Sequence, residues 1–279
     1  MLEFKDIPFV RSVFHPSDFS PESEHAFAHA LRIALARKTD FTILHVGSGR
    51  GKWEKFPSVR ATLERWGLLE KGSPRSAVFK DLGTRVKKVT VREGKTLDAI
   101  LEFLEMHPTD LIVVATSGRD GLPRWIRPSV AEEVARKSDT MTLFVPHAAK
   151  GFVSLEDGSA TLERILVPID HKPNPRPAIA YCTRAAKAVG GPVKIILAHV
   201  GDAEAPTPDL PEDSAWSWES IHRRGDIVDE IIKAAEEHDV DLIAMATEGR
   251  NGILDALRGS VTEQVLRRAP CPLLAVPTD

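Results

Sequence analysis

The residues that point most directly to chemistry are glycines, a serine and arginines between positions 242 and 263. Leu242 to Ala246 form a short apolar run of the length of a buried strand. Gly249 and Arg250 follow it, and Gly259 and Ser260 precede a helical pattern. Ser260 and Glu263 have the S-x-x-E spacing of a capping box, which predicts Ser260 as the N-cap.

A glycine-bearing loop between a strand and a helix N-terminus can receive a phosphate. The backbone N–H groups point outward there, and the helix dipole favours negative charge. Arg250 and Arg258 would add fixed positive charge beside such a site. The alternative is that the glycines serve only the turn and bind nothing, and the spacing alone leaves both interpretations open.

Composition bounds the class of protein. The chain has 279 residues and 42% hydrophobic residues, which allows one large domain or two of ordinary size. Its net charge of −3 does not indicate a nucleic-acid partner. We expect no signal peptide, because residues 1–6 lack a basic stretch followed by an apolar one. No apolar run approaches the roughly 20 residues that span a bilayer, so a membrane is not expected as a partner.

The two cysteines give no sign of a disulfide framework or a metal site. Cys182 and Cys271 are 89 positions apart (271 − 182) and form no CxxC pair. We expect both to be small buried thiols. This pattern fits a reducing cytoplasm.

Strands and helices alternate along the chain, and the pattern occurs twice. In the first half we expect strands at 10–14, 40–46, 85–91, 111–115 and 141–145, and helices near 59–69, at 97–107, and after the expected N-caps Ser20 and Ser129. Residues 165–170 repeat 13–18 at an offset of 152 (170 − 18), and 241–252 repeat 110–121 at an offset of 131 (252 − 121). The second half therefore lacks the helix near 59–69, and Pro206, Pro208 and Pro211 predict an extended loop there.

This repeat predicts an α/β fold of two tandem, doubly wound, parallel five-stranded sheets. Parallel strands need crossover connections, which the alternating helices supply. We expect one domain at 1–148 and a second at 162–279, joined by a linker near 146–161. Ligands bind beyond the carboxyl ends of such strands, where the strand order reverses. Asp170, Val200 and the 246–260 loop should converge on one crevice, and Asp18, Val46 and the 115–129 loop on another.

The chain resembles a tandem universal stress protein, with two such domains in one polypeptide. HPSDFSPESEHAFAHALRIA near the start, ILVPID at 165–170 and APCPLLAVP at 269–277 resemble the opening and closing strands of that family. The resemblance implies a Rossmann-like sheet of the adenine nucleotide alpha hydrolase type. It also implies that the closing strands, 143–145 and 273–276, pair to form a pseudo-dimer within the chain, and it allows a further homodimer.

The resemblance also implies a nucleotide site. Members that bind ATP carry G-x2-G-x9-G-S/T, and the second half supplies Ala246, Gly249 and Gly259-Ser260 in that spacing. The first half has Ala115, Gly118 and Pro128-Ser129, and the proline offers no N–H. By analogy the second half would hold ATP or another adenine nucleotide, with Mg²⁺ if present, through the following residues: Pro168, Asp170, Val200, Met245, Ala246, Gly249, Arg250, Gly259, Ser260 and Val261.

Two functions follow from the resemblance. The first is a stress-response regulator that binds adenine nucleotide in the second half and performs little or no catalysis, because no Walker lysine or evident water-orienting base is present. The second is a stress-responsive interaction module that acts through dimerisation and an unknown protein partner, and whose crevices are empty or bind another small ligand. Neither interpretation assigns a catalytic residue or a resident metal.

Other residues have simpler explanations than catalysis. We expect His25 and His29 to be a partly exposed pair on one helix face, since no third metal ligand accompanies them. We expect His45 and His199 to be core-edge residues satisfied by backbone. Trp216 and Trp218 should cover the sheet edge that the missing helix leaves bare, with a ligand lid or partner patch as the alternative.

Overall fold

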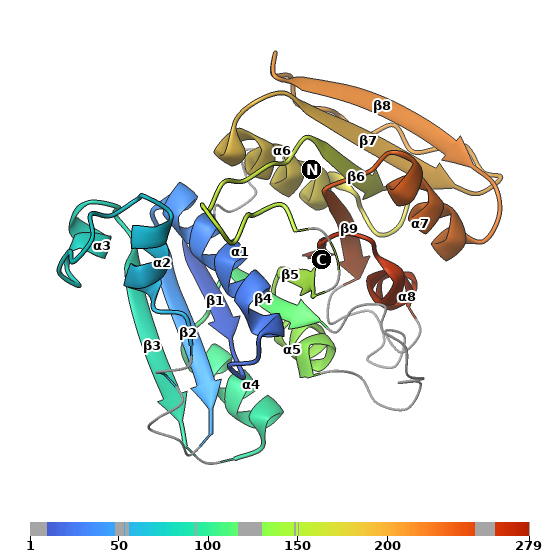
Figure 1. The fold of residues 1–279 in the computed structure, drawn as a ribbon. Helices are drawn as coiled ribbons and strands as arrows, with labels where there is room; N and C mark the ends of the chain where they lie inside the picture. The colour runs from blue at the N-terminus through green and yellow to red at the C-terminus, as the bar shows by residue number, and fades with distance from the viewer. Residues whose placement is uncertain are drawn as a thin grey trace.

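The ten strands among the described residues belong to one sheet. The computed structural model describes residues 10–47, 53, 56–92, 94–116, 130–147, 149, 151–248 and 260–278. The strand order is β3-β2-β1-β4-β5-β10-β9-β6-β7-β8. Each half thus has its first strand in the middle, its second and third strands on one side, and its fourth and fifth on the other (Figure 1).

The first half contains five strands and five helices among its described residues. In chain order they are β1 (Ser12–Pro16), α1 (Glu22–Arg37), β2 (Asp40–Val46), α2 (Val59–Arg65), α3 (Ala77–Lys80), β3 (Arg85–Val91), α4 (Thr96–Met106), β4 (Leu111–Thr116), α5 (Val130–Ser138) and β5 (Thr142–Pro146). The strands at 40–46 and 85–91 have the predicted bounds, and the others lie within two residues of them.

The second half contains five strands and three helices among its described residues. They are β6 (Arg164–Pro168), α6 (Arg176–Val189), β7 (Val193–Val200), β8 (Trp216–Arg223), α7 (Ile227–Glu237), β9 (Leu242–Glu248), α8 (Val261–Arg268) and β10 (Leu273–Thr278). Residues 201–215 connect β7 to β8 without a helix or strand, which confirms the extended proline-bearing loop.

Two local predictions need correction. Ser20 does not cap α1 with its side chain: the cap position is Pro21, and Ser20 instead donates its N–H to Asp18 Oδ1 at 2.9 Å. Trp216 and Trp218 do not cover a bare sheet edge from a loop, because they are part of the edge strand β8, opposite Val193 and Ile195 of β7. Their aromatic side chains pack partly buried against the core.

The two halves meet through their closing strands. β5 pairs with β10 in antiparallel fashion, with Leu143 opposite Leu274, whereas the neighbouring pairs β4–β5 and β9–β10 are parallel. The antiparallel pair β5–β10 therefore joins two parallel five-stranded sheets into one sheet. This arrangement confirms the predicted fold class and the predicted pairing of the closing strands.

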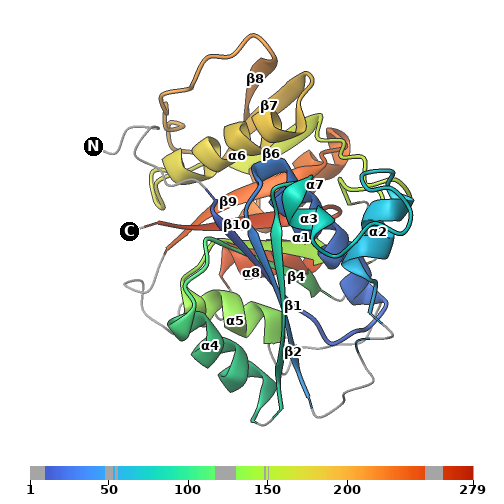
Figure 2. The ribbon, with the colours of Figure 1, turned by 90° about the vertical axis from the view of Figure 1, so that its left-hand side faces the viewer.

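Each face of the sheet carries one core that both halves share. Successive strand residues point to opposite faces, so Val13 and Ile165 enter one core and Phe14 and Leu166 the other. Helices α1, α2, α3 and α6 cover the first face, and α4, α5, α7 and α8 cover the second (Figures 1 and 2). Because each core draws on both halves, the halves stabilise one another.

The segment that connects the halves packs on the first half. Phe152, Val153 and Leu162 are buried. Phe152 donates its N–H to Nε2 of the buried His29 at 3.1 Å, and Leu155 accepts the indole N–H of Trp66 at 3.1 Å. These contacts hold the connecting segment against α1 and α2. The sequence predicts that His25 and His29 are both partly exposed. The structure corrects this for His29, which is buried, and His25 alone of the pair is partly exposed.

A glycine in the connecting segment meets an aromatic ring, which gives a testable prediction. Gly158 has φ +68°, and a Cβ there would lie 2.3 Å from Trp66 Cδ2. Gly158→Ala should therefore lower the free energy of unfolding by about 2–4 kcal/mol, from left-handed backbone strain plus the clash. Urea denaturation measures this loss.

Gly67→Ala is the matched control for that substitution. Gly67 has φ +69° and no atom within 4 Å of an added Cβ. It should lose only the backbone contribution, about 1–2 kcal/mol. Equal losses in the two variants would contradict the packing of the connecting segment on Trp66.

The buried His29 makes stability depend on pH. Its Nδ1 lies 2.7 Å from the carbonyl oxygen of His25 and its Nε2 accepts the Phe152 N–H, so the neutral ring is satisfied at both nitrogens. Burial lowers the pKa of His29 to about 4. Between pH 6.5 and about pH 4, His29 is protonated in the unfolded chain but neutral in the folded one. Because the unfolded state then binds more protons, the free energy of unfolding falls as the pH is lowered through this range.

We expect His29→Gln to flatten the fall of unfolding free energy between pH 7 and pH 4. The difference should be roughly 3 kcal/mol, at about 1.4 kcal/mol per pKa unit. Burial also lowers the pKa of His15 to about 4. The unfolding free energy of the His29→Gln variant should therefore still fall with pH, but less steeply. Urea titrations at several pH values measure the slope. His107→Gln, at an exposed position, should leave it unchanged, and an unaltered slope in His29→Gln would contradict the prediction.

Candidate functional site

The second half has its topological switch point between β6 and β9. β6 lies between β7 and β9 and is parallel to both. Pro168, the last residue of β6, pairs with Ala198 of β7. Leu166 pairs with Ile243, which puts Pro168 level with Met245 in the same register. The carboxyl ends of these strands therefore meet where doubly wound sheets bind ligands.

Two of the predicted residues lie at these carboxyl ends. Asp170 is exposed just beyond β6, and its Oδ1 accepts the N–H of His171 at 2.7 Å. Val200 ends β7 and is buried. Gly201, the next residue, donates its N–H to Arg223 of β8 at 3.0 Å, which fixes the chain where it leaves the sheet. Asp170 thus offers a carboxylate to solvent above an apolar floor.

The other described site residues lie at the end of β9 and the start of α8. Met245 is buried and Ala246 is half-buried. Ser260 Oγ accepts the N–H of Glu263 at 3.2 Å, which confirms the predicted cap. Gln264 donates its N–H to the Ser260 carbonyl, while no described residue accepts the amides of Val261 and Thr262. A helix N-terminus with such amides attracts negative charge.

Part of the predicted site cannot be placed. Gly249, Arg250, Arg258 and Gly259 lie outside the described residues, as does the whole 117–129 segment of the first half. The structure thus brings Pro168, Met245 and Ala246 to one edge of the sheet, with Asp170 and Val200 beyond the strand ends. It gives no position for the loop glycines.

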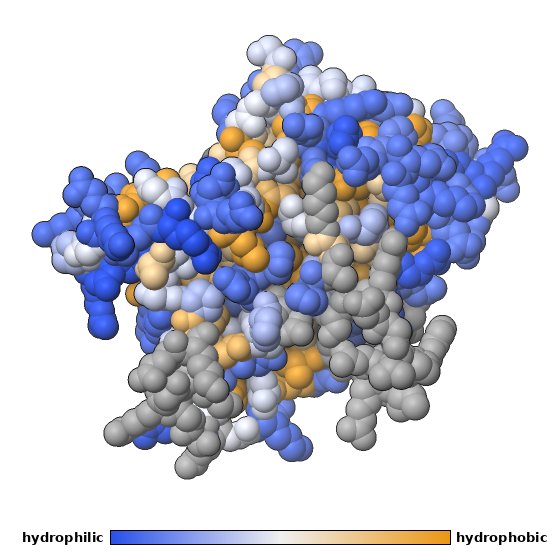
Figure 3. All heavy atoms as spheres, in the orientation of Figure 1, coloured by the Kyte–Doolittle hydropathy of each residue, from blue (hydrophilic) through white to orange (hydrophobic). Residues whose placement is uncertain are grey.

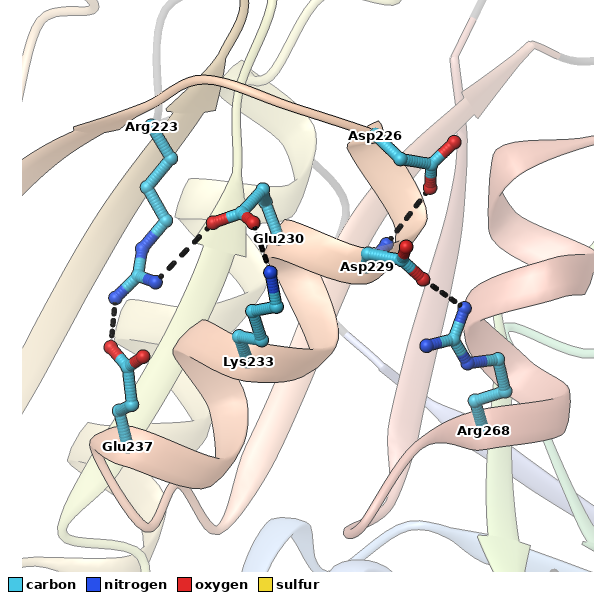
Figure 4. A network of polar contacts seen from close by, with 7 residues as sticks. All are labelled: Arg223, Asp226, Asp229, Glu230, Lys233, Glu237 and Arg268. Carbon is cyan, nitrogen blue, oxygen red and sulfur yellow. Dashed lines mark hydrogen bonds and ion pairs between the residues drawn. The ribbon is translucent and has the colours of Figure 1, made fainter.

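A network of ion pairs fixes the helices behind this edge (Figure 4). Asp226 caps α7 by accepting the N–H of Asp229 at 3.0 Å. The Asp229 carboxylate pairs with Arg268 of α8 at 2.6 Å. These two contacts tie the beginning of α7 to the end of α8.

The same network ties α7 to the edge strand β8. Arg223, at the end of β8, reaches Glu230 at 3.5 Å and also pairs with Glu237 (Figure 4). The Arg223 side chain is only 18% exposed and that of Glu230 only 14%, so solvent screens this pair less than an open surface pair. α7 therefore has fixed neighbours on both sides, and through it α8 is held in place.

The first half has aromatic rings at its equivalent edge. Phe19, directly after Asp18, has φ +64° and stacks on the buried His45 with ring centroids 3.9 Å apart. Trp53 and Phe56 pack on Phe19 at 4.8 and 5.2 Å. The Trp53 indole donates to Thr90 Oγ1 at 2.8 Å, which anchors it to β3. These rings cover the carboxyl end of β2.

The two halves therefore differ at the residue that follows the strand-end aspartate. The repeat offset of 152 aligns Phe19 with His171 (171 − 19). His171 is exposed, and its Nε2 lies 3.0 Å from the carbonyl oxygen of Glu204 in the proline-bearing loop. The sequence interpretation did not single out either residue. Aligning the two halves position by position through this stretch would have shown the difference.

The histidines and cysteines have structural roles. His199 is satisfied by backbone, as expected, because its Nδ1 and Nε2 each lie 3.2 Å from a carbonyl oxygen, those of Ile169 and Ala203. His45 is so only in part: its Nδ1 lies 2.8 Å from the Ser17 carbonyl, whereas its buried Nε2 has no hydrogen-bond partner among the described residues. Cys182 and Cys271 are buried and free. Burial raises the pKa of the Cys182 thiol, and it raises that of Cys271 to about 12.

The described residues contain no group of three or more His, Cys, Asp or Glu side chains arranged to hold a metal ion. Within the same ranges, no helix combines the length and the apolar character needed to cross a bilayer.

Comparison with known proteins identifies the family. The model of the universal stress protein family matches residues 10–146 and 212–277. The chain therefore belongs to the universal stress protein family. This match, on both halves, agrees with the internal repeat and with the shared strand order.

Individual relatives cover the chain unevenly. A universal stress protein of Methanothermobacter thermautotrophicus is 46% identical over 68 residues, which are 24% of this chain and 46% of that protein. The curated relatives that match are thus covered over less than half of their own lengths, from 28% to 46%. Similarity in sequence is concentrated in short segments.

Solved structures show the fold over the whole chain. A universal stress protein from Archaeoglobus fulgidus aligns with a TM-score of 0.62 at 18% identity, covering 96% of this chain and 98% of that one. A universal stress protein described as in complex with cAMP aligns with 50% of this chain and 98% of its own, at 22% identity and a TM-score of 0.35. The first likeness supports the arrangement of all ten strands.

Proposed function

We propose that this chain is a stress-response regulator that binds ATP or a related adenine nucleotide in its second half. The observation that carries the proposal is the contrast between two equivalent sheet edges. In the second half Asp170 is exposed beyond β6, and the half-buried Ser260 caps the N-terminus of α8. In the first half Phe19 and Trp53 pack over the matching edge.

The proposed site uses each described residue for a distinct contact. Pro168, Val200 and Met245 form an apolar floor on which a base can lie, and the Asp170 carboxylate can accept hydrogen bonds from ribose hydroxyls or an amino group. Ser260 and Val261 begin α8, where backbone amides and the helix dipole favour phosphate. Ala246 borders the loop in which Gly249, Arg250 and Gly259 would supply further amides and charge.

Binding rather than catalysis is the proposed activity. The sequence has no Walker lysine, and the proposed site includes no residue in the role of a general base. Positioning and charge stabilisation for phosphoryl transfer are thus incomplete, and hydrolysis should be slow at most. Mg²⁺ would enter with the nucleotide. Bound nucleotide would then shift the protein between partner-binding states. The free buried thiols fit our proposal of a reducing, cytoplasmic setting.

The second candidate is an interaction module without a nucleotide. The aromatic cluster of the first half favours it, because that half keeps the family's strand order while rings cover its sheet edge. In this account the protein acts through a protein partner or a further homodimer.

The matched pair Asp170→Asn and Asp18→Asn tests the proposal. Both aspartates follow the first strand of their half, and both are exposed. Titration calorimetry with MgATP should give one site per chain for the natural protein. Asp170→Asn should weaken binding about tenfold, the effect of losing one charge-assisted hydrogen bond, whereas Asp18→Asn should have no effect.

Gly259→Pro gives a second variant for the same test. It places proline where the first half has Pro128, and so removes an amide and fixes φ. This variant should lose MgATP binding and keep its thermal unfolding midpoint. Unchanged affinity in both Asp170→Asn and Gly259→Pro would reject the assigned residues. No heat of binding with MgATP, ADP or AMP would reject the nucleotide and favour the interaction module.

A further inference from the structure

A cleft in the first half lies between the edge strand β3, the start of β2 and the helices α2 and α3. Its volume is about 960 Å³, and pockets that bind small molecules measure about 300–1,000 Å³. The strand residues that line it are 40–42 and 84–88, at the start of β2 and β3. The cleft is therefore distinct from the candidate nucleotide site, which lies at the carboxyl ends of strands in the second half.

The segment that builds this cleft belongs to the first half. The connection from β2 to β3 spans residues 47–84 and contains α2 and α3, which lie beside these strands (Figures 1 and 2). The equivalent connection from β7 to β8 spans only residues 201–215 and contains no helix. The second half thus lacks the helices that form one wall of the cleft, and the duplication alone does not explain it.

The lining of the cleft carries an excess of positive charge. Five basic residues line it: Arg60, Arg75, Arg85, Lys87 and Lys88. Asp40 is the one acidic residue among the described residues of the lining, and it pairs with Arg85 at 3.8 Å. Mostly hydrophilic side chains cover the region of α2 and α3 in Figure 3, with a few apolar ones among them. This charge balance favours an anion as the occupant of the cleft.

Two of these cations, Arg75 and Lys88, have no carboxylate partner in the part of the chain that the structure describes. The Lys88 ammonium lies 5.1 Å from the centroid of the Trp53 ring and 5.7 Å from that of Phe56. Partial burial lowers the pKa of Lys88, and the positive charge of Arg75 lowers it further. An anion between these two side chains would replace their mutual repulsion by attraction to both.

Aromatic and apolar side chains complete the cleft. Trp53 stands beside the carboxyl-terminal part of β3, where its indole N–H donates to Thr90 Oγ1 at 2.8 Å. Phe79 of α3 stands beside the start of β3, with the Arg85 guanidinium 5.4 Å from its ring centroid, and it is 52% exposed. The apolar residues between them are Val59, Val78 and Val86. An occupant with a flat apolar body could pack against this surface.

We propose that this cleft binds a small aromatic phosphate ester, whose phosphate lies between Arg75 and Lys88. Its ring would lie on the apolar surface between Trp53 and Phe79. A phosphate monoester carries a charge of about −1.5 to −2 at pH 7, which two cations can balance. The guanidinium can bind two phosphate oxygens in a planar geometry, while the ammonium acts as a point charge. Burial of the ring would contribute about 25 cal/mol per Å² of apolar surface.

The proposal does not rest on nucleotide binding in the second half. None of the residues that line the cleft belongs to the candidate nucleotide site, so each site can be removed while the other stays intact. The first half would then bind its own ligand, at a different place on the sheet from the second half.

Titration calorimetry of the full chain with 1-naphthyl phosphate tests the proposal. We expect one site per chain, which the Asp170→Asn variant retains. The uncharged 1-naphthol lacks the phosphate, and inorganic phosphate lacks the ring. Each should bind at least about tenfold more weakly, because each loses one of the two contributions to the affinity.

Arg75→Gln and Lys88→Gln should each weaken 1-naphthyl phosphate binding about tenfold, the effect of losing one charge-assisted hydrogen bond. Lys80→Gln is the matched control, because it removes a positive charge from an exposed residue of α3 that does not line the cleft. It should bind the probe as the natural protein does. Phe79→Ala removes an exposed ring, so it should weaken binding and leave the thermal unfolding midpoint unchanged.

Three results would overturn the proposal. The first is natural affinity for 1-naphthyl phosphate in both Arg75→Gln and Lys88→Gln, or no binding to the natural protein. The second is equal affinity for 1-naphthol and 1-naphthyl phosphate. The third is binding that Asp170→Asn abolishes and Lys88→Gln leaves unchanged, because the probe would then occupy the candidate nucleotide site. Failure of MgATP to bind would reject the proposed function and leave this cleft unaffected.

Discussion

The antiparallel pairing of β5 with β10 is the interaction on which the rest of the structure depends. An open parallel sheet exposes a row of unpaired backbone groups along each edge strand, which invites association with other chains. Here each half satisfies that row with the closing strand of the other. Because both closing strands belong to one polypeptide, the pairing needs no second molecule. It also makes each hydrophobic core continuous across the halves.

The two halves share one strand order and differ at the carboxyl ends of their strands. The first half uses Phe19, Trp53 and Phe56 to cover the end of β2, with α2 and α3 beside it. The second half replaces that region with a proline-bearing loop, and the exposed His171 stands where the first half has Phe19. A duplicated fold can diverge in this way because the sheet and its two cores carry the stability, while the loops at the strand ends carry the function.

Much of the fold could be predicted from the sequence because its signals are local and repeated. The strand at 40–46, the strand at 85–91 and the cap at Ser260 follow from apolar runs and capping chemistry. Ser20 fails as a cap because Pro21 takes the cap position and the Ser20 N–H turns back to Asp18. His29 is buried because the connecting segment, 123 residues away at Phe152, packs on it. No local pattern carries that information.

The sequence predicted which strand ends form the candidate site, but it did not predict that aromatic rings cover the equivalent edge of the first half. The aspartates and strand ends are visible as repeats, but the role of Phe19 depends on how it stacks with His45 and with Trp53, 34 positions further along the chain (53 − 19). A groove between α1 and α6 is likewise a product of tertiary structure. Arg32 and Arg184, which line it, share the repeat offset of 152 (184 − 32), yet only the joining of the two halves brings them to one space.

Amide hydrogen exchange of β5 and β10, measured at two protein concentrations, tests the joining of the two sheets most directly. The account predicts that amides of these strands, such as those of Phe144 and Leu274, belong to the slowest-exchanging class. Their rates should not change with concentration, since the pairing is intramolecular. Fast exchange typical of an unpaired edge, or protection that rises with concentration, would contradict the account.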